Sequence, residues 1–159
     1  MIERTLILVK PDAVERGLVG EIINRFETVG LKIIGLKMVW VDKEFCRKHY
    51  APHVDKPFYP GLEVFMTSGP VVAMVLEGIK AVAIARKFIG DTEPLRALPG
   101  TIRGDYAFHS YSYTDNKGIP IKNLVHASDS AENAKAEIEL WFNNTELHKY
   151  STVHDKHVL

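Results

Sequence analysis

The chain has 159 residues, of which 46% are hydrophobic and 25% are charged, so it is expected to form a single domain, residues 1–159, with one substantial core. Its 20 basic and 20 acidic residues cancel, and this balance gives no indication of a nucleic-acid-binding or membrane-binding surface. The one cysteine, Cys46, excludes an intrachain disulfide and favours a reducing, cytoplasmic compartment. We expect neither a signal peptide nor a membrane span, because the longest apolar runs have only the length of strands.

The spacing of apolar residues predicts alternating strands and helices. Continuous β-branched runs such as residues 5–9 are typical of buried strands, whereas Leu18, Ile22 and Phe26 recur at the spacing of an amphipathic helix. In chain order we expect a strand over 5–9 stopped by Pro11, a helix from 18 to about 30, a strand over 31–41, a short helix capped by Asp42, a strand over 71–76, a helix over 82–89 and a loop over 91–104.

An added segment lies between residues 106 and 122. Residues 107–114 alternate aromatic and polar side chains in part, and the turn-rich run 115–118 follows them. We therefore predict an inserted hairpin over about 106–122. Its aromatic side chains are expected to pack against a neighbouring subunit.

The last strand is expected at 124–125. Asp129, with Glu132 three residues later, is typical of a helix start, so a helix over 131–142 should follow and leave a tail over about 143–159. The complete order predicts an α+β fold of the ferredoxin-like (split βαβ) type. In this fold an antiparallel sheet has helices packed on it, here expected on one face.

Common nucleotide-binding and metal-binding motifs do not occur in the sequence. It contains neither a P-loop nor G-x-G-x-x-G, and neither C-x-x-C nor H-E-x-x-H. His49 and His53 have the i, i+4 spacing of metal ligands, but Pro52 lies between them, so a solvated turn is the favoured interpretation. We therefore assign no residue as a metal ligand.

His126 is the strongest candidate for chemistry. It lies where the predicted strand ends, and the small residues after it leave room for a substrate beside the ring. A neutral imidazole is a competent nucleophile near pH 7, because its unperturbed pKa is about 6.5. A histidine at a strand end is nevertheless more often structural than catalytic, so His126 needs support from the rest of the chain.

That support comes from four segments that resemble the nucleoside diphosphate kinase family in the same order. They are residues 5–13 (TLILVKPDA), 68–75 (SGPVVAMV), 99–105 (PGTIRGD) and 123–130 (NLVHASDS). The resemblance extends from about residue 3 to residue 142. One departure is the connection over 106–122, which is usually shorter in the family.

The resemblance implies a site assembled from side chains around His126 as the catalytic nucleophile. Lys10 at a strand end, Arg86 on a helix and Arg103 in a Gly-flanked loop would bind phosphate, together with Thr92, while Asn123 would contact the sugar and Phe58 would stack on the base. The supporting residues would be Tyr50 near the phosphates, Glu137 as the carboxylate that orients the His126 ring, and Ser128 as the partner of Glu137. Ala127 replaces a glycine of many members, so this position should need no left-handed backbone.

The implied activity is that of a phosphotransferase. The γ-phosphate of a nucleoside triphosphate, typically ATP, would move to His126 and then to a nucleoside diphosphate, a ping-pong exchange that maintains the other nucleoside triphosphate pools. The resemblance also implies Mg²⁺ bound mainly through the nucleotide phosphates, with Asp129 or Asp12 in reach, and a homo-oligomer, first of all a hexamer.

Two alternatives belong to other classes of protein. One is a non-catalytic ferredoxin-like module that binds nucleotide, nucleic acid or a partner protein, but such a module would be expected to lose some of the matched side chains. The other is a histidine phosphocarrier between proteins, which would need neither Phe58 nor Asn123.

Overall fold

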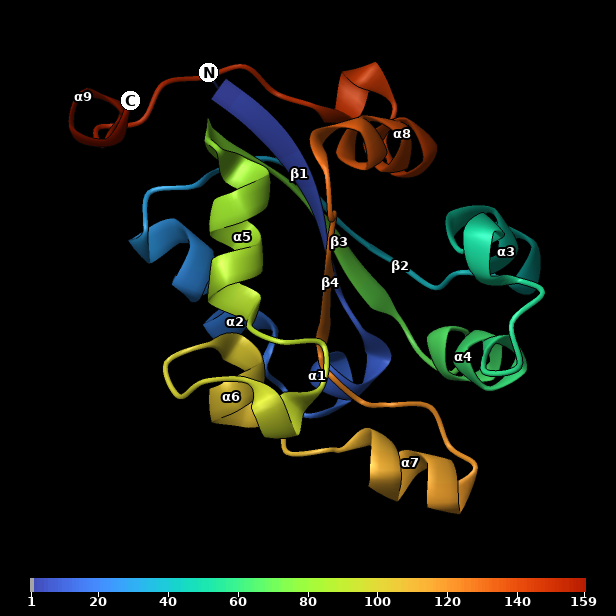
Figure 1. Cartoon of the computed structure of the whole chain (residues 1–159). Coiled ribbons are helices and arrows are strands. Elements are labelled where there is room, and N and C mark those ends of the chain that lie inside the picture. Colours follow the sequence, from blue (N-terminus) through green and yellow to red (C-terminus); the bar gives the residue numbers. More distant parts are fainter. Residues whose placement is uncertain (1) are drawn as a thin grey trace.

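The computed structural model describes residues 2–159, and within this range an antiparallel sheet of four strands forms the centre of the protein (Figure 1). The strands are β1 (Ile2–Val9), β2 (Lys32–Val39), β3 (Val71–Ile79) and β4 (Val125–Ala127), in the spatial order β2-β3-β1-β4. β1 pairs along its whole length with β3 and holds the short β4 on its other side. This order is ferredoxin-like, so the predicted fold class is confirmed.

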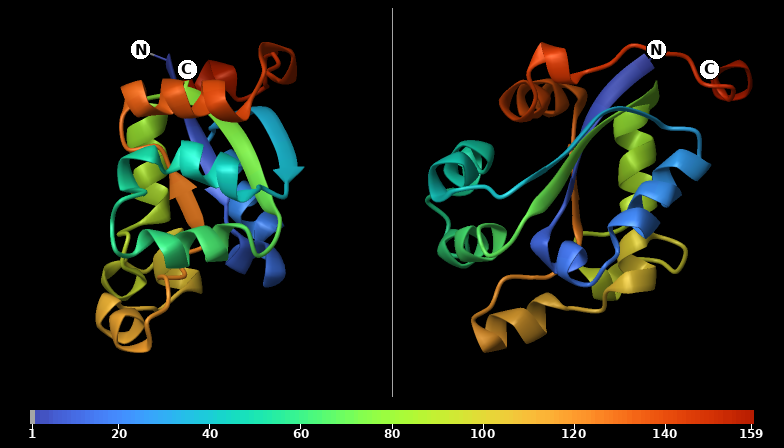
Figure 2. Two further views of the ribbon diagram at one scale, coloured as in Figure 1. Left: turned by 90° about the vertical axis from the view of Figure 1, so that its right-hand side faces the viewer. Right: turned by 180° about the vertical axis from the view of Figure 1, so that it is seen from behind.

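Helices cover both faces of the sheet (Figure 2). On one face, α2 and α5 enclose a core that includes Phe26 and Met74, and on the other α3, α4 and α8 enclose a core that includes Leu8 and Trp141. The expectation of helices on one face was therefore wrong, because β1 and β3 are apolar on both sides and each side needs a cover. The helices are α1 (Pro11–Glu15), α2 (Val19–Thr28), α3 (Lys43–His49), α4 (Tyr59–Met66), α5 (Ala81–Ile89), α6 (Ile102–Tyr106), α7 (Tyr111–Lys117), α8 (Ala131–Trp141) and α9 (Asp155–Val158), with 3₁₀ turns at Ala51–His53, Pro94–Arg96 and Asn144–Glu146.

Most strongly periodic elements lie where the sequence predicts them. Asp42 caps α3 by accepting a hydrogen bond from the Phe45 N–H at 2.8 Å, and α5 ends at Gly90 as expected. The sequence interpretation missed α1 and α4, whose first turns contain a proline. Proline is favoured there because the first helical N–H groups have no partner inside the helix.

The hairpin predicted for the insertion segment, residues 106–122, was wrong. Residues 111–117 form α7, because the Ser110 hydroxyl accepts a hydrogen bond from the Tyr113 N–H at 3.2 Å and Gly118 ends the helix at φ +62°. The turn-rich run that suggested a hairpin turn is therefore the last turn of a helix. The loop predicted over 91–104 was also wrong at its end, because α6 begins at Ile102 and carries Arg103.

The start of α8 also differs from its prediction. Ser130, rather than Asp129, is the N-cap and accepts a hydrogen bond from the Asn133 N–H at 3.1 Å, while Asp129 accepts from the Asn133 side chain at 2.7 Å. Both residues can act as caps, and the extended backbone of Ser130 decides between them. Within residues 2–159, none of the helices combines the length and the apolar character needed to cross a bilayer.

Candidate functional site

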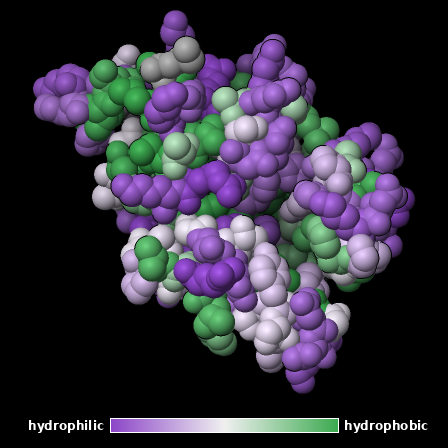
Figure 3. Space-filling model, in the orientation of Figure 1, coloured by the Kyte–Doolittle hydropathy of each residue, from purple (hydrophilic) through white to green (hydrophobic). Residues whose placement is uncertain are grey.

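A cavity of about 670 Å³ opens beside β4, between the α3–α4 pair and α7. Figure 3 shows this face of the molecule hollowed between the lobe on the right and the body of the sheet. All the predicted site residues except Ser128 line the cavity, although they come from distant parts of the chain: Lys10, Tyr50, Phe58, Arg86, Thr92, Arg103, Asn123, His126 and Glu137. The fold therefore brings the predicted set together.

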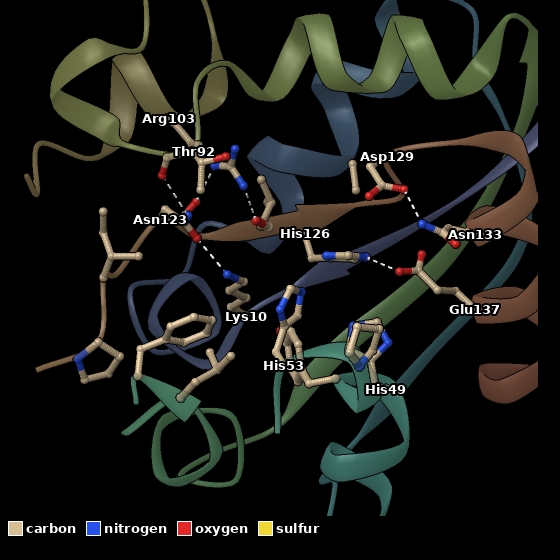
Figure 4. Close-up of a pocket in the computed structure, with 18 of the residues that line it drawn as sticks. Lys10, His49, His53, Thr92, Arg103, Asn123, His126, Asp129, Asn133 and Glu137 are labelled. Carbon is tan, nitrogen blue, oxygen red and sulfur yellow. Dashed lines mark hydrogen bonds and ion pairs between the residues drawn. The ribbon is translucent and has the colours of Figure 1, made fainter. Parts of the chain in front are cut away.

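His126 lies in the middle of β4, where a carboxylate from α8 orients its ring (Figure 4). Its Nε2 is 3.0 Å from Glu137 Oε1, and the Ser128 hydroxyl donates to the other Glu137 oxygen at 2.5 Å. Ser128 is itself fixed, because its oxygen accepts a hydrogen bond from the Leu6 N–H at 3.1 Å. Since the carboxylate accepts a hydrogen bond from the Nε2–H, the neutral ring has its proton on Nε2, and Nδ1 of His126 keeps its lone pair.

A second histidine, His49, lies against this ring and was missed by the sequence interpretation. The two ring centroids are 4.9 Å apart and the rings meet edge to face, at 84°. Trp141 Nε1 donates to His49 Nδ1 at 3.1 Å, and burial together with the nearby His126 lowers the pKa of His49 well below its usual value. His49 is therefore neutral, with its proton on Nε2.

This tautomer decides how a nearby group of possible metal ligands is interpreted. His49, His126 and Glu137 each offer one possible ligand atom, and these three atoms lie within 4.8 Å of one another. With Nδ1 occupied by Trp141 and a proton on Nε2, His49 has no free lone pair for a metal. The i, i+4 partner His53 instead accepts a hydrogen bond from Lys56 Nζ at 2.8 Å. We therefore assign no metal ligand in this group.

Lys10 supplies a buried positive charge at the end of β1. Its ammonium donates to Asn123 Oδ1 at 2.7 Å, and the Asn123 amide donates in turn to the Thr92 carbonyl at 2.9 Å. Burial and the nearby Arg103 lower the pKa of Lys10 to about 8. Because an ammonium has three donors, Lys10 can still bind an anion in the cavity.

Arg103 is held by the backbone on its inner side. Its guanidinium donates to the carbonyl oxygens of Asn123 at 3.1 Å, Gly90 at 3.0 Å and Val125 at 2.7 Å. Burial and the neighbouring Arg86 lower the pKa of Arg103 to about 10, so it remains charged at neutral pH. Arg86 is exposed on α5 and faces the same cavity. Of the two arginines in the cavity wall, Arg103 is thus fixed in place, whereas Arg86 is exposed and can follow a ligand.

The backbone before His126 has an unusual conformation. Leu124 has φ +71°, which costs a residue with a side chain roughly 1–2 kcal/mol. Its N–H donates to Asp12 Oδ2 at 3.2 Å, and its carbonyl accepts from the Lys10 N–H at 2.8 Å. Ala127 is not among the left-handed residues of the described chain, as predicted. Asp12 therefore stabilises the backbone turn at Leu124 and does not line the cavity.

The outer wall of the cavity carries Phe58 on one side and the insertion segment on the other. Phe58, before α4, is 54% exposed, so a planar ligand could stack on its ring. The Tyr50 hydroxyl is buried without a hydrogen-bond partner in the described chain, and burial raises the pKa of Tyr50. Tyr111 and Asp115 of α7 also line the cavity, and the hairpin prediction had not indicated this.

The whole chain is similar to proteins of one family. Residues 3–147 match the family model described as nucleoside diphosphate kinase. The chain is 51% identical to the nucleoside diphosphate kinase of Pyrococcus furiosus over 97% of its own length and 91% of the relative, and 54% identical to that of a Cyanothece species over 91% of each.

Solved structures agree with this similarity. The fold matches a transition-state mimic of the nucleoside-diphosphate kinase from Borrelia burgdorferi with bound vanadate and ADP at a TM-score of 0.95 and 40% identity, covering 99% of this chain and 96% of that one. A Halobacterium salinarum nucleoside diphosphate kinase in complex with CDP matches at a TM-score of 0.89 and 43% identity, covering 100% and 99%.

Proposed function

Because this chain belongs to the nucleoside diphosphate kinase family, and is thereby a nucleotide phosphotransferase, we propose that it transfers the γ-phosphate of a nucleoside triphosphate through a phosphohistidine at His126. The observation that carries the proposal is the His126–Glu137 pair, which keeps Nδ1 unprotonated beside Lys10 and Arg103 in one cavity. Such an exchange, with ATP as the usual donor, would maintain the pools of the other nucleoside triphosphates.

In the first half of the proposed reaction, Nδ1 of His126 attacks the γ-phosphorus in line. A P–N bond forms, the bond from this phosphorus to the β–γ bridging oxygen breaks, and the diphosphate leaves with that electron pair. Glu137 stabilises the positive charge that develops on the ring. In the second half, a terminal oxygen of another nucleoside diphosphate attacks the phosphorus and the P–N bond breaks. One cavity suffices because donor and acceptor are alike.

The other cavity residues would bind and orient the nucleotide. Lys10 and the two arginines would neutralise the phosphate oxygens, with Thr92 and the unpaired Tyr50 hydroxyl as further donors. We assign Asn123 to the sugar and Phe58 to the base. Stacking on an aromatic ring is tolerant of base identity, because every base has a π-face.

We propose Mg²⁺ as the cofactor, bound mainly through the nucleotide phosphates, whose negative charge it reduces. Of the two candidate carboxylates, Asp129 fits, because it lines the cavity and the hydrogen bond from Asn133 lowers its pKa, which keeps it ionised. Carboxylate oxygen is a ligand that Mg²⁺ prefers. Asp12 does not fit, since one of its oxygens holds the Leu124 N–H and it lies outside the cavity wall.

A label-chase experiment tests the function. The protein is incubated with ATP labelled at the γ-phosphate, freed of nucleotide, and then mixed with GDP. We expect label on the protein that moves to GTP. Label that GDP cannot remove would favour the phosphocarrier, and a protein that binds ATP without taking up label would favour the non-catalytic module.

The pH dependence of kcat/KM should reflect Lys10. This quantity reports the free enzyme, in which the Lys10 pKa is about 8, so kcat/KM is expected to fall as the pH rises through 8 and the ammonium loses its charge. In Lys10→Arg the guanidinium stays charged, so the descending limb should move to higher pH. Rates measured from pH 6 to 10 check this, and an unmoved limb in the variant would assign the ionisation to another group.

We propose that the protein forms a homo-oligomer, first of all a hexamer. Two separate surfaces expose large apolar side chains: the outer face of β2, with Leu36 and Met38, and the region of Leu95 and Phe108, of which Phe108 is 86% exposed. When a chain contacts its own copies through two different surfaces, the closed assembly has more than one kind of symmetry axis. Sedimentation should give the mass of six chains, and a monomer mass would contradict the proposal.

The buried free thiol of Cys46 suits the cytoplasm as the proposed compartment.

A further inference from the structure

We propose that Arg25, on α2, is a positioning residue for phosphoryl transfer, because it holds α6, and with it Arg103, in place. The proposal rests on the proposed function. Arg25 does not line the cavity, so it would act through Arg103 rather than on the nucleotide.

Arg25 joins α2 to a segment about eighty residues later in the chain. Its Nη2 donates to Asp105 Oδ2 at 2.7 Å and to the Tyr106 hydroxyl at 2.8 Å, and its Nη1 donates to the Gly100 carbonyl at 3.1 Å. Its Nε donates to Glu21 at 3.2 Å on its own helix. The planar guanidinium thus uses every nitrogen, which a lysine could not reproduce.

The partners of Arg25 are also bonded to one another. Asp105 accepts from the Gly100 N–H at 2.7 Å, and the Tyr106 hydroxyl donates to Glu21 at 2.7 Å. Hydrogen bonds from Tyr106 and Arg25 lower the pKa of Glu21, and those from Gly100 and Arg25 lower the pKa of Asp105, so both carboxylates are charged at neutral pH. The cluster is a closed network around one cation.

This network and the contacts of Arg103 hold the same short helix, α6, since Asp105 and Tyr106 lie within three residues of Arg103. α6 has only 5 residues, too few to be stable without such contacts. The Arg103 side chain bonds three backbone carbonyls, two of them within three residues of His126. Arg25 bonds the Asp105 and Tyr106 side chains of the same helix. Releasing the Arg25 network would let α6, and with it Arg103, shift relative to His126.

The effect on the rate should exceed the effect on stability. The Arg25 and Asp105 side chains are 25% and 27% exposed, and partly exposed ion pairs of this kind contribute little to stability. A displacement of about 1 Å at a reacting group, in contrast, can cost roughly 10²-fold in rate. A positioning role therefore predicts a loss of kcat in a protein that remains folded.

The first test is Arg25→Ala. We expect kcat to fall by about 10–100-fold with little change in KM, and Arg25→Lys to recover only part of the loss. Arg4→Ala is the matched control, because it removes a comparable ion pair with Glu77, at 3.0 Å, away from the cavity. Asp105→Asn is the second variant should Arg25→Ala fold poorly. Mass and unfolding temperature are measured on each protein.

The second test is a double-mutant cycle with Arg103→Lys. If Arg25 acts through Arg103, Arg25→Ala should cost much less in the Arg103→Lys background than in the unaltered chain. Amide exchange over residues 100–106 should also become faster in Arg25→Ala. Equal losses in both backgrounds, an unchanged kcat, or a loss that only follows dissociation of the assembly would each overturn the proposal. Absence of label transfer in the unaltered protein would reject the proposed function, whereas the exchange measurement would still report on α6.

Discussion

Replacing His126 with alanine should abolish both the phosphoprotein and the exchange of phosphate between nucleotides. Removing the nucleophile leaves no lone pair to form the P–N bond, and loss of a covalent nucleophile costs about 10⁶-fold in kcat in a comparable two-step enzyme. Nucleotide binding should remain measurable, because Lys10 and Arg103 still line the cavity. Label transfer and equilibrium binding on the same protein check the two halves of this expectation.

The chemistry of the labelled protein provides an independent test. A phosphohistidine is acid-labile and alkali-stable, so the label should be lost in acid and kept in base. His154→Ala, in the exposed tail, is the matched control and should retain label and exchange. Glu137→Gln should fall between the two variants, because it keeps the shape of the side chain but changes how Nε2 is held. Recovery of an acid-stable phosphoserine as the turnover intermediate would reject the mechanism.

Removing one phosphate-binding cation should lower turnover more than binding. Arg86→Ala and Lys10→Ala are each expected to cost about 10²–10³-fold in kcat, because these charges stabilise the transferring group most strongly in the transition state. Phe58→Ala is the contrasting variant. Its ring is exposed and is assigned to the base rather than to the phosphates, so loss of stacking, roughly 1–3 kcal/mol, should appear mainly in KM. If Arg86→Ala changed only KM, its contribution would be uniform binding.

Arg103→Ala should behave differently from these variants. It removes a charge and also leaves the buried Val125 carbonyl without its donor, at a cost of about 1–3 kcal/mol, whereas the Asn123 carbonyl keeps its hydrogen bond from the Val125 N–H at 2.8 Å. We therefore expect a lower kcat together with a lower free energy of unfolding, whereas Arg86→Ala should affect kcat alone, because its side chain is exposed. Denaturant unfolding beside the kinetics separates the two effects, and a normal stability for Arg103→Ala would show that its carbonyl bonds matter little.

Local patterns predicted the elements whose signals are periodic and whose ends carry clear caps. The α3 helix with Asp42 and the α5 helix ending at Gly90 are examples, since propensity and capping act within a few residues. The same reasoning failed for α7, where partial alternation of aromatic residues was interpreted as a hairpin and the caps Ser110 and Gly118 were not recognised. Alternation over so few residues is weak unless a neighbouring strand exists to pair with it.

The sequence by itself determined the family, the fold class and the residues of the predicted site, because four contiguous motifs hold five of these side chains and the resemblance between the motifs indicated the other five. Only the tertiary structure decided which groups surround them. His49 meets Trp141 across 92 positions of the chain and Arg25 meets Asp105 across 80, and neither pair has a local pattern. Contacts between distant segments depend on how the sheet and its helices pack. The neutral state of His49 and the support of α6 therefore follow from packing alone.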